Sequence, residues 1–437
     1  MILRGRNSIS ITVLACMLIA CSTAHINTSD TVAKPDGPPV ITYHPFESEQ
    51  DLAVLLKEIG DARIVLLGES THGTSEYYEW RAAITKKLIT EKGFDFVAVE
   101  GDWTDLYKVN EFIQGTVRDS SAAVEILKQY DRWPQSIWSN YEMASLTTWL
   151  NSYNQARESN KIAFYGLDLY SFSKWTNEKL PVADSSIQRA AHELHQKFLR
   201  FNNDALLYTD AVRHSKIDYR ESAENFWKAV ENFSSKHVED SSTFWLQQHA
   251  LLALEGERYF RTMVTDRQRS WNIRDGYMAQ TIKRLLQLHG KNSKAIIWVH
   301  NAHAGDAHYS NMGSYGYTSV GEILRKEFGR KVFSTGFGTN KGFVMAGYSW
   351  NAPVQEQVVL PAKAGSWESV LHELSPENKL ILSKEIRNNS SLTKWIEFRS
   401  IGAAYSGAAV YGTSIIPQRF DAFVFIDSTT AVHPIKK

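Results

Sequence analysis

Short apolar runs rich in β-branched residues recur along the chain, and helix-like segments separate most of them. The runs cover residues 63–67, 94–99, 162–165, 295–299, 332–336, 357–360 and 422–426. Between the first two, residues 74–91 carry apolar side chains close to helical spacing. Nearly continuous apolar strands that alternate with helices indicate a buried, largely parallel sheet flanked by helices. The sequence therefore predicts an α/β fold.

One long stretch departs from this alternation. Between about residues 175 and 288 the pattern is helical throughout, which is too long for a simple crossover between two strands. We therefore expect a helical insertion or cap on an α/β domain that spans residues 45–437. The chain of 437 residues is 43% hydrophobic, which is enough for a large core.

The first residues have the features of a bacterial export signal. Arg4 and Arg6 precede a mostly apolar run, residues 8–20, that is too short to span a membrane. The run ends in Leu-Ile-Ala-Cys, which resembles the lipobox of bacterial lipoproteins. We expect a signal peptide over residues 1–20, a lipid on Cys21 and a flexible tether over residues 21–44. Ser22 favours the outer membrane, so the expected location is the cell envelope, facing the periplasm in a Gram-negative organism.

Composition excludes several classes of protein. Cys16 and Cys21 are the two cysteines of the chain, so the predicted domain has no disulfide, thiol nucleophile or cysteine-based zinc site. The formal net charge is zero and no basic block stands out, which gives nucleic-acid binding no electrostatic support. We expect a monomer whose partners are a small-molecule substrate and, through the lipid, the membrane.

Acidic and imidazole side chains follow four of the predicted strands. In chain order they are Glu69 and His72, then Glu100 and Asp102, then Asp168, and finally His300, Asn301 and His303. Because ligands bind at the carboxyl ends of the strands in parallel α/β sheets, we expect these residues to form one site. Arg81 follows Thr74 by seven residues, which places both on one side of a helix and lets Arg81 reach back toward His72. A cation there would stabilise an oxyanion and lower the pKa of nearby carboxylates.

Two other chemistries use part of the same set. Ser70, Asp168 and His300 follow the order of an α/β-hydrolase triad, but His72 stands where the nucleophile elbow needs a glycine. A divalent metal held by His72, His300, His303 and Glu100, with Glu69 nearby, is the second alternative. The spacing of His300 and His303 differs from the helical HExxH pattern, and this pair follows a predicted strand.

Four segments resemble the erythromycin esterase family: GESTHGTSEYYEWR, VAVEGDW, NIRDGYMA and WVHNAHAGD. The resemblance covers about residues 45–430. It implies an α/β core with helical additions and an esterase that opens a macrolide lactone with water. The resemblance leaves metal dependence open, and we expect an enzyme that works without a metal. The catalytic set that it implies is Glu69, His72, Arg81, Glu100, His300 and His303. The position of Ser70 is commonly a proline in the family, which argues against a serine nucleophile.

This set suggests general-base hydrolysis. His72 would take a proton from water, because imidazole exchanges protons near neutral pH. Glu69 or Glu100 would orient His72, and Arg81 with His300 or His303 would polarise the ester carbonyl. The substrate stays open between a macrolide and another hydrophobic ester or lactone. A non-catalytic lipoprotein that binds a ligand is the alternative from a different class.

Overall fold

The computed structural model describes residues 41–115, 122–172, 184–202, 204–215, 217–236, 241–407 and 410–436. The expected signal peptide, Cys21 and most of the expected tether lie outside these residues. Within the described ranges, no helix has the length and apolar character needed to cross a membrane.

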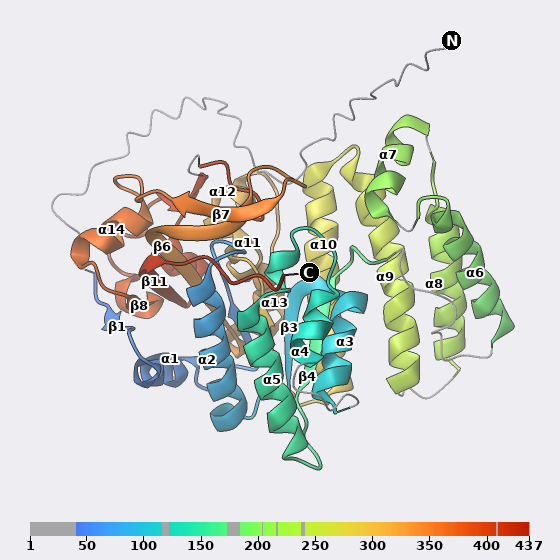
Figure 1. Ribbon diagram of the computed structural model, residues 1–437, viewed down its shortest axis with the longest axis horizontal. Coiled ribbons are helices and arrows are strands. Elements are labelled where there is room, and N and C mark those ends of the chain that lie inside the picture. Colours follow the sequence, from blue (N-terminus) through green and yellow to red (C-terminus); the bar gives the residue numbers. More distant parts are fainter. Residues whose placement is uncertain are drawn as a thin grey trace, which may run out of the picture.

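A nine-stranded sheet forms the centre of the molecule (Figure 1). Its order is β1 (His44–Pro45), β8 (Lys379–Leu382), β11 (Ala422–Thr429), β6 (Val332–Gly347), β2 (Ile64–Leu67), β5 (Ala295–Trp298), β3 (Phe96–Asp102) and β4 (Ala163–Asp168). The strands from β11 to β4 are parallel to their neighbours, whereas β1, β8 and β7 (Val354–Val359) pair antiparallel at the margins. The predicted α/β class with a largely parallel sheet is confirmed.

All seven predicted apolar runs coincide with strands, and the predicted helix is α2 (Ser75–Lys92). The sequence did not reveal β1, β8 or the separate hairpin of β9 (Ile396–Arg399) and β10 (Tyr411–Ser414), because such short runs carry little periodic signal. It also ended β6 too early. The outer part of β6, from Gly342, pairs with β7, and its glycine-rich sequence breaks the apolar run.

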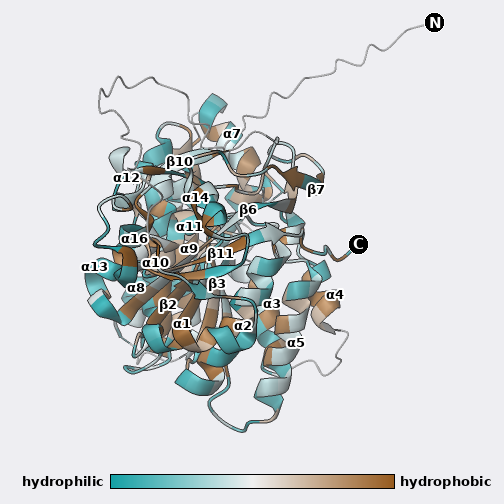
Figure 2. Cartoon of the chain, turned by 90° about the vertical axis from the view of Figure 1, so that its left-hand side faces the viewer, coloured by the Kyte–Doolittle hydropathy of each residue, from teal (hydrophilic) through white to brown (hydrophobic). Residues whose placement is uncertain are grey.

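Both faces of the sheet are covered, which explains why its strands are apolar at successive positions. Ile64 and Leu66 of β2 pack into one hydrophobic cluster, and Val65 and Leu67 pack into the other. The second cluster contains residues of α1 (Leu52–Ile59), α2, α3 (Trp103–Ile113), α4 (Ala122–Lys128) and α5 (Tyr141–Gln155). In Figure 2 the strands are largely brown, and teal residues lie on the outer surfaces of the helices.

The opposite face packs against helices that include the long helical segment. This segment comprises α6 (Ser185–Leu199), α7 (Ala205–Ser215), α8 (Arg220–Ser234), α9 (Ser241–Met263) and α10 (Arg267–Leu288). α10 contacts β4 and α13 (Val320–Phe328), and α9, α8 and α6 follow outward from it in that order (Figure 1). α14 (Trp367–Leu374) and the short helices α11 (Asn301–Ala304), α12 (Asn311–Ser314), α15 (Ser383–Ile386) and α16 (Ile416–Arg419) complete the described α-helices.

Candidate active site

The predicted residues meet at the carboxyl ends of three adjacent strands. β5 lies between β2 and β3, so the loop after β2, the end of β3 and the start of α11 are neighbours. The loop after β2 contacts α11 directly, since the N–H of Asn301 donates to the carbonyl of Glu69 (2.8 Å). Gly68 allows this approach, because a Cβ on it would lie 2.2 Å from the Asn301 side-chain oxygen.

Glu69 lies between His72 and Arg81. One carboxylate oxygen of Glu69 is 2.8 Å from His72 Nδ1, and the other is 2.6 Å from a terminal nitrogen of Arg81. Glu69 and Arg81 are buried, whereas 15% of the His72 side chain is exposed. Burial raises the pKa of Glu69, but the Arg81 charge and the His72 hydrogen bond outweigh it and lower this pKa overall. An ionised Glu69 requires a hydrogen on Nδ1 of His72, so Nε2 carries the free lone pair.

Arg81 is enclosed by aromatic side chains and the backbone. Its guanidinium carbon lies 4.7 Å from the ring centre of Tyr78 and 4.6 Å from that of Trp298, and its Nε donates to the carbonyl of Tyr77 (3.2 Å). The side chain is fully buried. In this structure Arg81 contacts Glu69 and has no exposed surface toward a substrate.

His300 lies beside His72, with 5.1 Å between the ring centres. Its Nδ1 accepts the N–H of Ala302 (3.2 Å) and thereby caps α11, and its Nε2 lies 3.3 Å from the carbonyl oxygen of Ile401. Burial, together with the nearby His72, lowers the pKa of His300 to about 3. His300 is therefore a neutral imidazole whose hydrogen is on Nε2.

Glu100 does not contact His72. One of its oxygens accepts the backbone N–H of His300 (2.7 Å), and the other accepts from Arg274 (2.8 Å) and lies 3.3 Å from His303 Nε2. Burial opposes ionisation, yet the charges of His303 and Arg274 hold the pKa of Glu100 well below its usual range. Of the two carboxylates that were expected to orient His72, it is Glu69 that does so in this structure.

His303 is buried beneath Trp271. The two rings stack with centres 4.5 Å apart and planes inclined by 10°. Nδ1 of His303 lies 2.9 Å from both oxygens of Asp275 and donates to this carboxylate. Burial opposes a charge here, but Asp275 and Glu100 together raise the pKa of His303 to about 9.

Sequence reasoning missed Arg274 and Asp275 as site residues. Both are on α10, and 4% and 0% of their surfaces are exposed. Their signal was present in the segment NIRDGYMA, where two adjacent charges share a helix with Ile273, Tyr277 and Met278, all buried. Buried charges need partners, so such a pair on a core-facing helix indicates an ion-pair network.

The other predicted strand-end acids are partners in that network. Asp168 accepts from Arg274 Nε (2.9 Å) and a terminal nitrogen (2.7 Å), so the pair is bidentate. Asp102 accepts the N–H of Ser171 (2.9 Å) and lies 3.4 Å from Arg132. The network extends the site from β5 across β3 to β4.

Ser70 is not arranged as a nucleophile. Its side chain is buried, and its hydroxyl oxygen lies 2.8 Å from the hydroxyl of Tyr77. Its carbonyl accepts the N–H of Ile401 (2.7 Å). The hydroxyl is thus paired with a tyrosine instead of a histidine.

The proposed metal ligands His72, His300, His303 and Glu100 do not fit a metal site in this arrangement. Nδ1 of His300 caps its own helix, and His303 lies between two carboxylates that favour its protonated form. A histidine that binds a metal must instead present the lone pair of a neutral imidazole. Among the residues that the structure describes, no group of three or more His, Cys, Asp or Glu side chains is placed to hold a metal ion.

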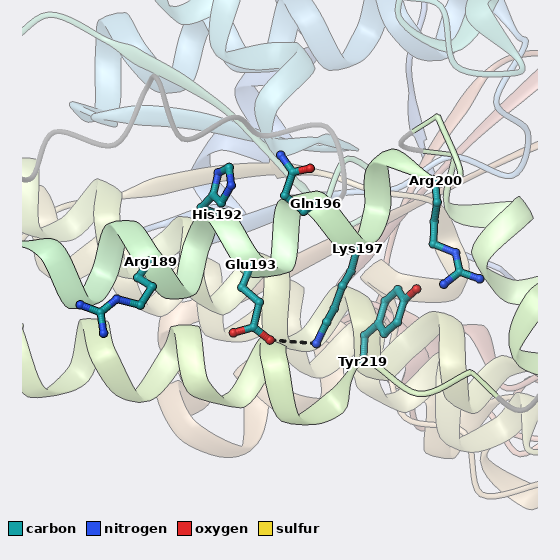
Figure 3. Close-up of a pocket in the computed structure, with 7 residues that line it drawn as sticks. All are labelled: Arg189, His192, Glu193, Gln196, Lys197, Arg200 and Tyr219. Carbon is teal, nitrogen blue, oxygen red and sulfur yellow. Dashed lines mark hydrogen bonds and ion pairs between the residues drawn. The ribbon is translucent and has the colours of Figure 1, made fainter.

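A depression in the surface of the helical segment lies apart from these residues (Figure 3). Its lining comes from α6, the residue after α6 and the residue before α8, and consists of Arg189, His192, Glu193, Gln196, Lys197, Arg200 and Tyr219. Glu193 and Lys197, one turn apart on α6, form an exposed ion pair of 2.9 Å. It contains none of the strand-end residues and is a solvated helix surface.

The fold and the site define an α/β protein with a carboxylate–histidine couple at the ends of its parallel strands. The sequence pattern of the erythromycin esterase family matches residues 89–429, more than half of the chain. The chain therefore belongs to the erythromycin esterase family, a family of hydrolases. The match begins after Glu69, His72 and Arg81, so the description of these three residues rests on the geometry above.

Individual relatives are distant. The chain is 22% identical over 395 residues to erythromycin esterase type II of Escherichia coli, covering 82% of this chain and 90% of that protein. A Bacillus cereus protein of known structure has a TM-score of 0.75 at 20% identity, with 92% and 96% of the two chains covered. An erythromycin esterase mutant in its open conformation has a TM-score of 0.65 at 17% identity, with 89% and 98% covered. These structures establish the shared fold.

Proposed function

We propose that the protein hydrolyses a carboxylic ester or lactone with a water molecule activated by His72. The observation that supports this most directly is the chain of contacts from Arg81 through Glu69 to His72 Nδ1. These contacts leave Nε2 of His72, the one partly exposed residue of the three, as the proton acceptor. A base must accept a proton from water at hydrogen-bond distance, and an oriented neutral imidazole has this capacity.

In this mechanism Glu69 stabilises the imidazolium that forms on His72, and Arg81 acts through Glu69. This revises the sequence-based hypothesis that Arg81 polarises the carbonyl, because Arg81 is fully buried. His300 takes that role in the proposal. It is a neutral donor, its ring centre is 5.1 Å from that of His72, and its Nε2 hydrogen bond to Ile401 is long at 3.3 Å. Exchange of that carbonyl for the substrate oxygen would stabilise the tetrahedral oxyanion.

We propose a macrolide lactone as the first substrate to test, on the basis of the family and of the Escherichia coli relative. Erythromycin and a panel of hydrophobic esters and lactones would be incubated with the protein, and the addition of one water would be followed by mass spectrometry. Each reaction is repeated with a chelator. Turnover that is unaffected by the chelator and absent in His72→Asn supports the proposal.

Two outcomes would replace the proposed hydrolysis by His72. Loss of turnover with the chelator would indicate a metal-dependent hydrolase. Saturable binding without hydrolysis of any compound would indicate a ligand-binding lipoprotein.

We also propose that the chain is anchored in the bacterial envelope through a lipid on Cys21, as the lipobox-like sequence suggests. Replacing Cys21 with alanine should then release the protein from the membrane fraction and abolish labelling with palmitate. Labelling that survives the replacement would contradict the assignment.

A further inference from the structure

Three side chains on one face of α10 contact His303. Trp271 stacks on its ring, Asp275 accepts from Nδ1 at 2.9 Å, and Arg274 has a terminal nitrogen 3.0 Å from Nε2. Arg274 and Asp275 follow Trp271 by three and four residues, so the three side chains share a helix face. The plane of the ring and both of its nitrogens are thus in contact with a single helix of the helical segment.

Arg274 extends this face to the ends of two strands. It binds Asp168 at the end of β4 through two nitrogens (2.9 and 2.7 Å) and Glu100 of β3 through one (2.8 Å). The planar guanidinium suits such a bidentate contact. Glu100 in turn accepts the backbone N–H of His300 (2.7 Å). The position of the backbone at His300 therefore depends on α10.

Packing alone does not account for these residues. Asp275 is completely buried and Arg274 is 4% exposed, on a helix whose other inward residues include Ile273, Tyr277 and Met278. Well-packed apolar side chains at such positions are commonly as stable as buried ion pairs, or more so. The charged pair instead provides directed hydrogen bonds to Glu100 and His303.

We propose that the face formed by Trp271, Arg274 and Asp275 is the positioning element of the hydrolytic site. It holds His303 and Glu100 in one arrangement without contacting the substrate. This inference rests on the proposed ester hydrolysis. It makes the helical segment a part of the active site in addition to a covering layer of the sheet.

The first test compares Asp275→Asn with Asp266→Asn. Asp266 is the N-cap of the same helix and accepts the N–H of Arg269 (2.9 Å), a bond that asparagine also makes. Asp275→Asn should lower kcat about 100-fold, as expected for a misplaced catalytic group, and leave KM unchanged. Asp266→Asn should keep both constants. Circular dichroism reports the folded fraction, and a kcat for folded Asp275→Asn equal to that of the wild type would overturn the proposal.

The second test uses chemical rescue. Arg274→Ala should lose about 100-fold in kcat, and added guanidinium ion should restore part of it by occupying the vacated site. Arg284→Ala is the matched control on α10, since Arg284 contacts Gln247 and Gln248 of α9 (2.8 and 3.0 Å). Equal responses of the two variants to guanidinium would refute a specific role of Arg274.

A third measurement does not depend on activity. The hydrogen that His303 donates to Asp275 should give a downfield imidazole N–H resonance in the wild type and in Asp266→Asn. The resonance should shift or vanish in Asp275→Asn, with His303→Gln as its assignment control. If the wild type cleaves no ester, the proposed function fails, and this resonance alone decides whether α10 holds His303. An unchanged resonance in Asp275→Asn would disprove the contact.

Discussion

Replacement of Arg81 with methionine should cause two separable losses. The first is stability, because the substitution removes the cation 2.6 Å from a Glu69 oxygen. The side chains of Arg81 and Glu69 are 0% and 3% exposed, so Glu69 would either stay as an uncompensated buried carboxylate or bind a proton at a cost in free energy. Breaking a buried pair in this way costs about 3–5 kcal/mol. Domains have about 5–15 kcal/mol of stability, so this loss is a large part of the total, and activities are compared at equal concentrations of folded protein.

The second loss is chemical. Burial raises the pKa of Glu69, and the Arg81 charge is the main influence that lowers it. Without Arg81 this pKa rises, so Glu69 becomes protonated and donates to Nδ1 of His72. The hydrogen of His72 then moves to Nε2, which removes the lone pair that would accept a proton from water. A wrong tautomer of this kind lowers kcat by up to about 10⁴-fold. Because a carboxylate reforms above its pKa, some activity should return as the pH rises.

The double variant Glu69→Gln/Arg81→Met separates the two effects. It leaves no uncompensated charge, so it should regain about 2 kcal/mol of the stability lost in Arg81→Met, a coupling typical of contacting residues. Hydrolysis should stay absent, because a neutral amide cannot stabilise the imidazolium of His72. Urea unfolding followed by circular dichroism gives the free energies, and initial rates over a range of pH give the activity. The reasoning is refuted if Arg81→Met is as stable as the wild type, or if the double variant regains hydrolysis.

Three further predictions follow from the same structure. His72→Asn should abolish hydrolysis with little effect on the melting temperature, since this side chain is partly exposed; residual turnover in the folded variant would exclude it as the base. Ser70→Ala should retain kcat and lose about 1 kcal/mol of stability through the hydrogen bond to Tyr77, and a dead but folded variant would revive the serine nucleophile. His433 donates to Glu142, which raises its pKa above the ordinary value of 6.5, so the pair stabilises the fold below that pH and loses its effect as pH rises through the folded pKa. His433→Gln should therefore cost up to about 1 kcal/mol in acid and nothing in alkaline solution, and an equal cost at both pH values would contradict this linkage.

The class of the fold and the common strand edge of the candidate site residues could both be predicted from the sequence. Ile64 and Val65 are apolar at successive positions because each faces a different layer of helices, and this pattern is readable without a structure. The positions of Glu69, Glu100 and His300 directly after such runs predicted a common edge, since parallel strands end on the same side of a sheet. These inferences use local periodicity and one rule of topology, so they need no knowledge of contacts between distant residues.

Tertiary structure alone decided how these side chains are paired. Glu69 and Glu100 are both acids at strand ends, and their sequence positions cannot tell which one reaches His72. The folded chain places Glu69 against His72 and turns Glu100 toward Arg274, which is 174 residues away. Hydrogen bonds depend on separations of a few tenths of an ångström, and charge states depend on burial and on neighbours from other elements. These quantities arise only when β2, β3, β5 and α10 have packed together, which is why the partners of Arg274 and Asp275 could be found only in the structure.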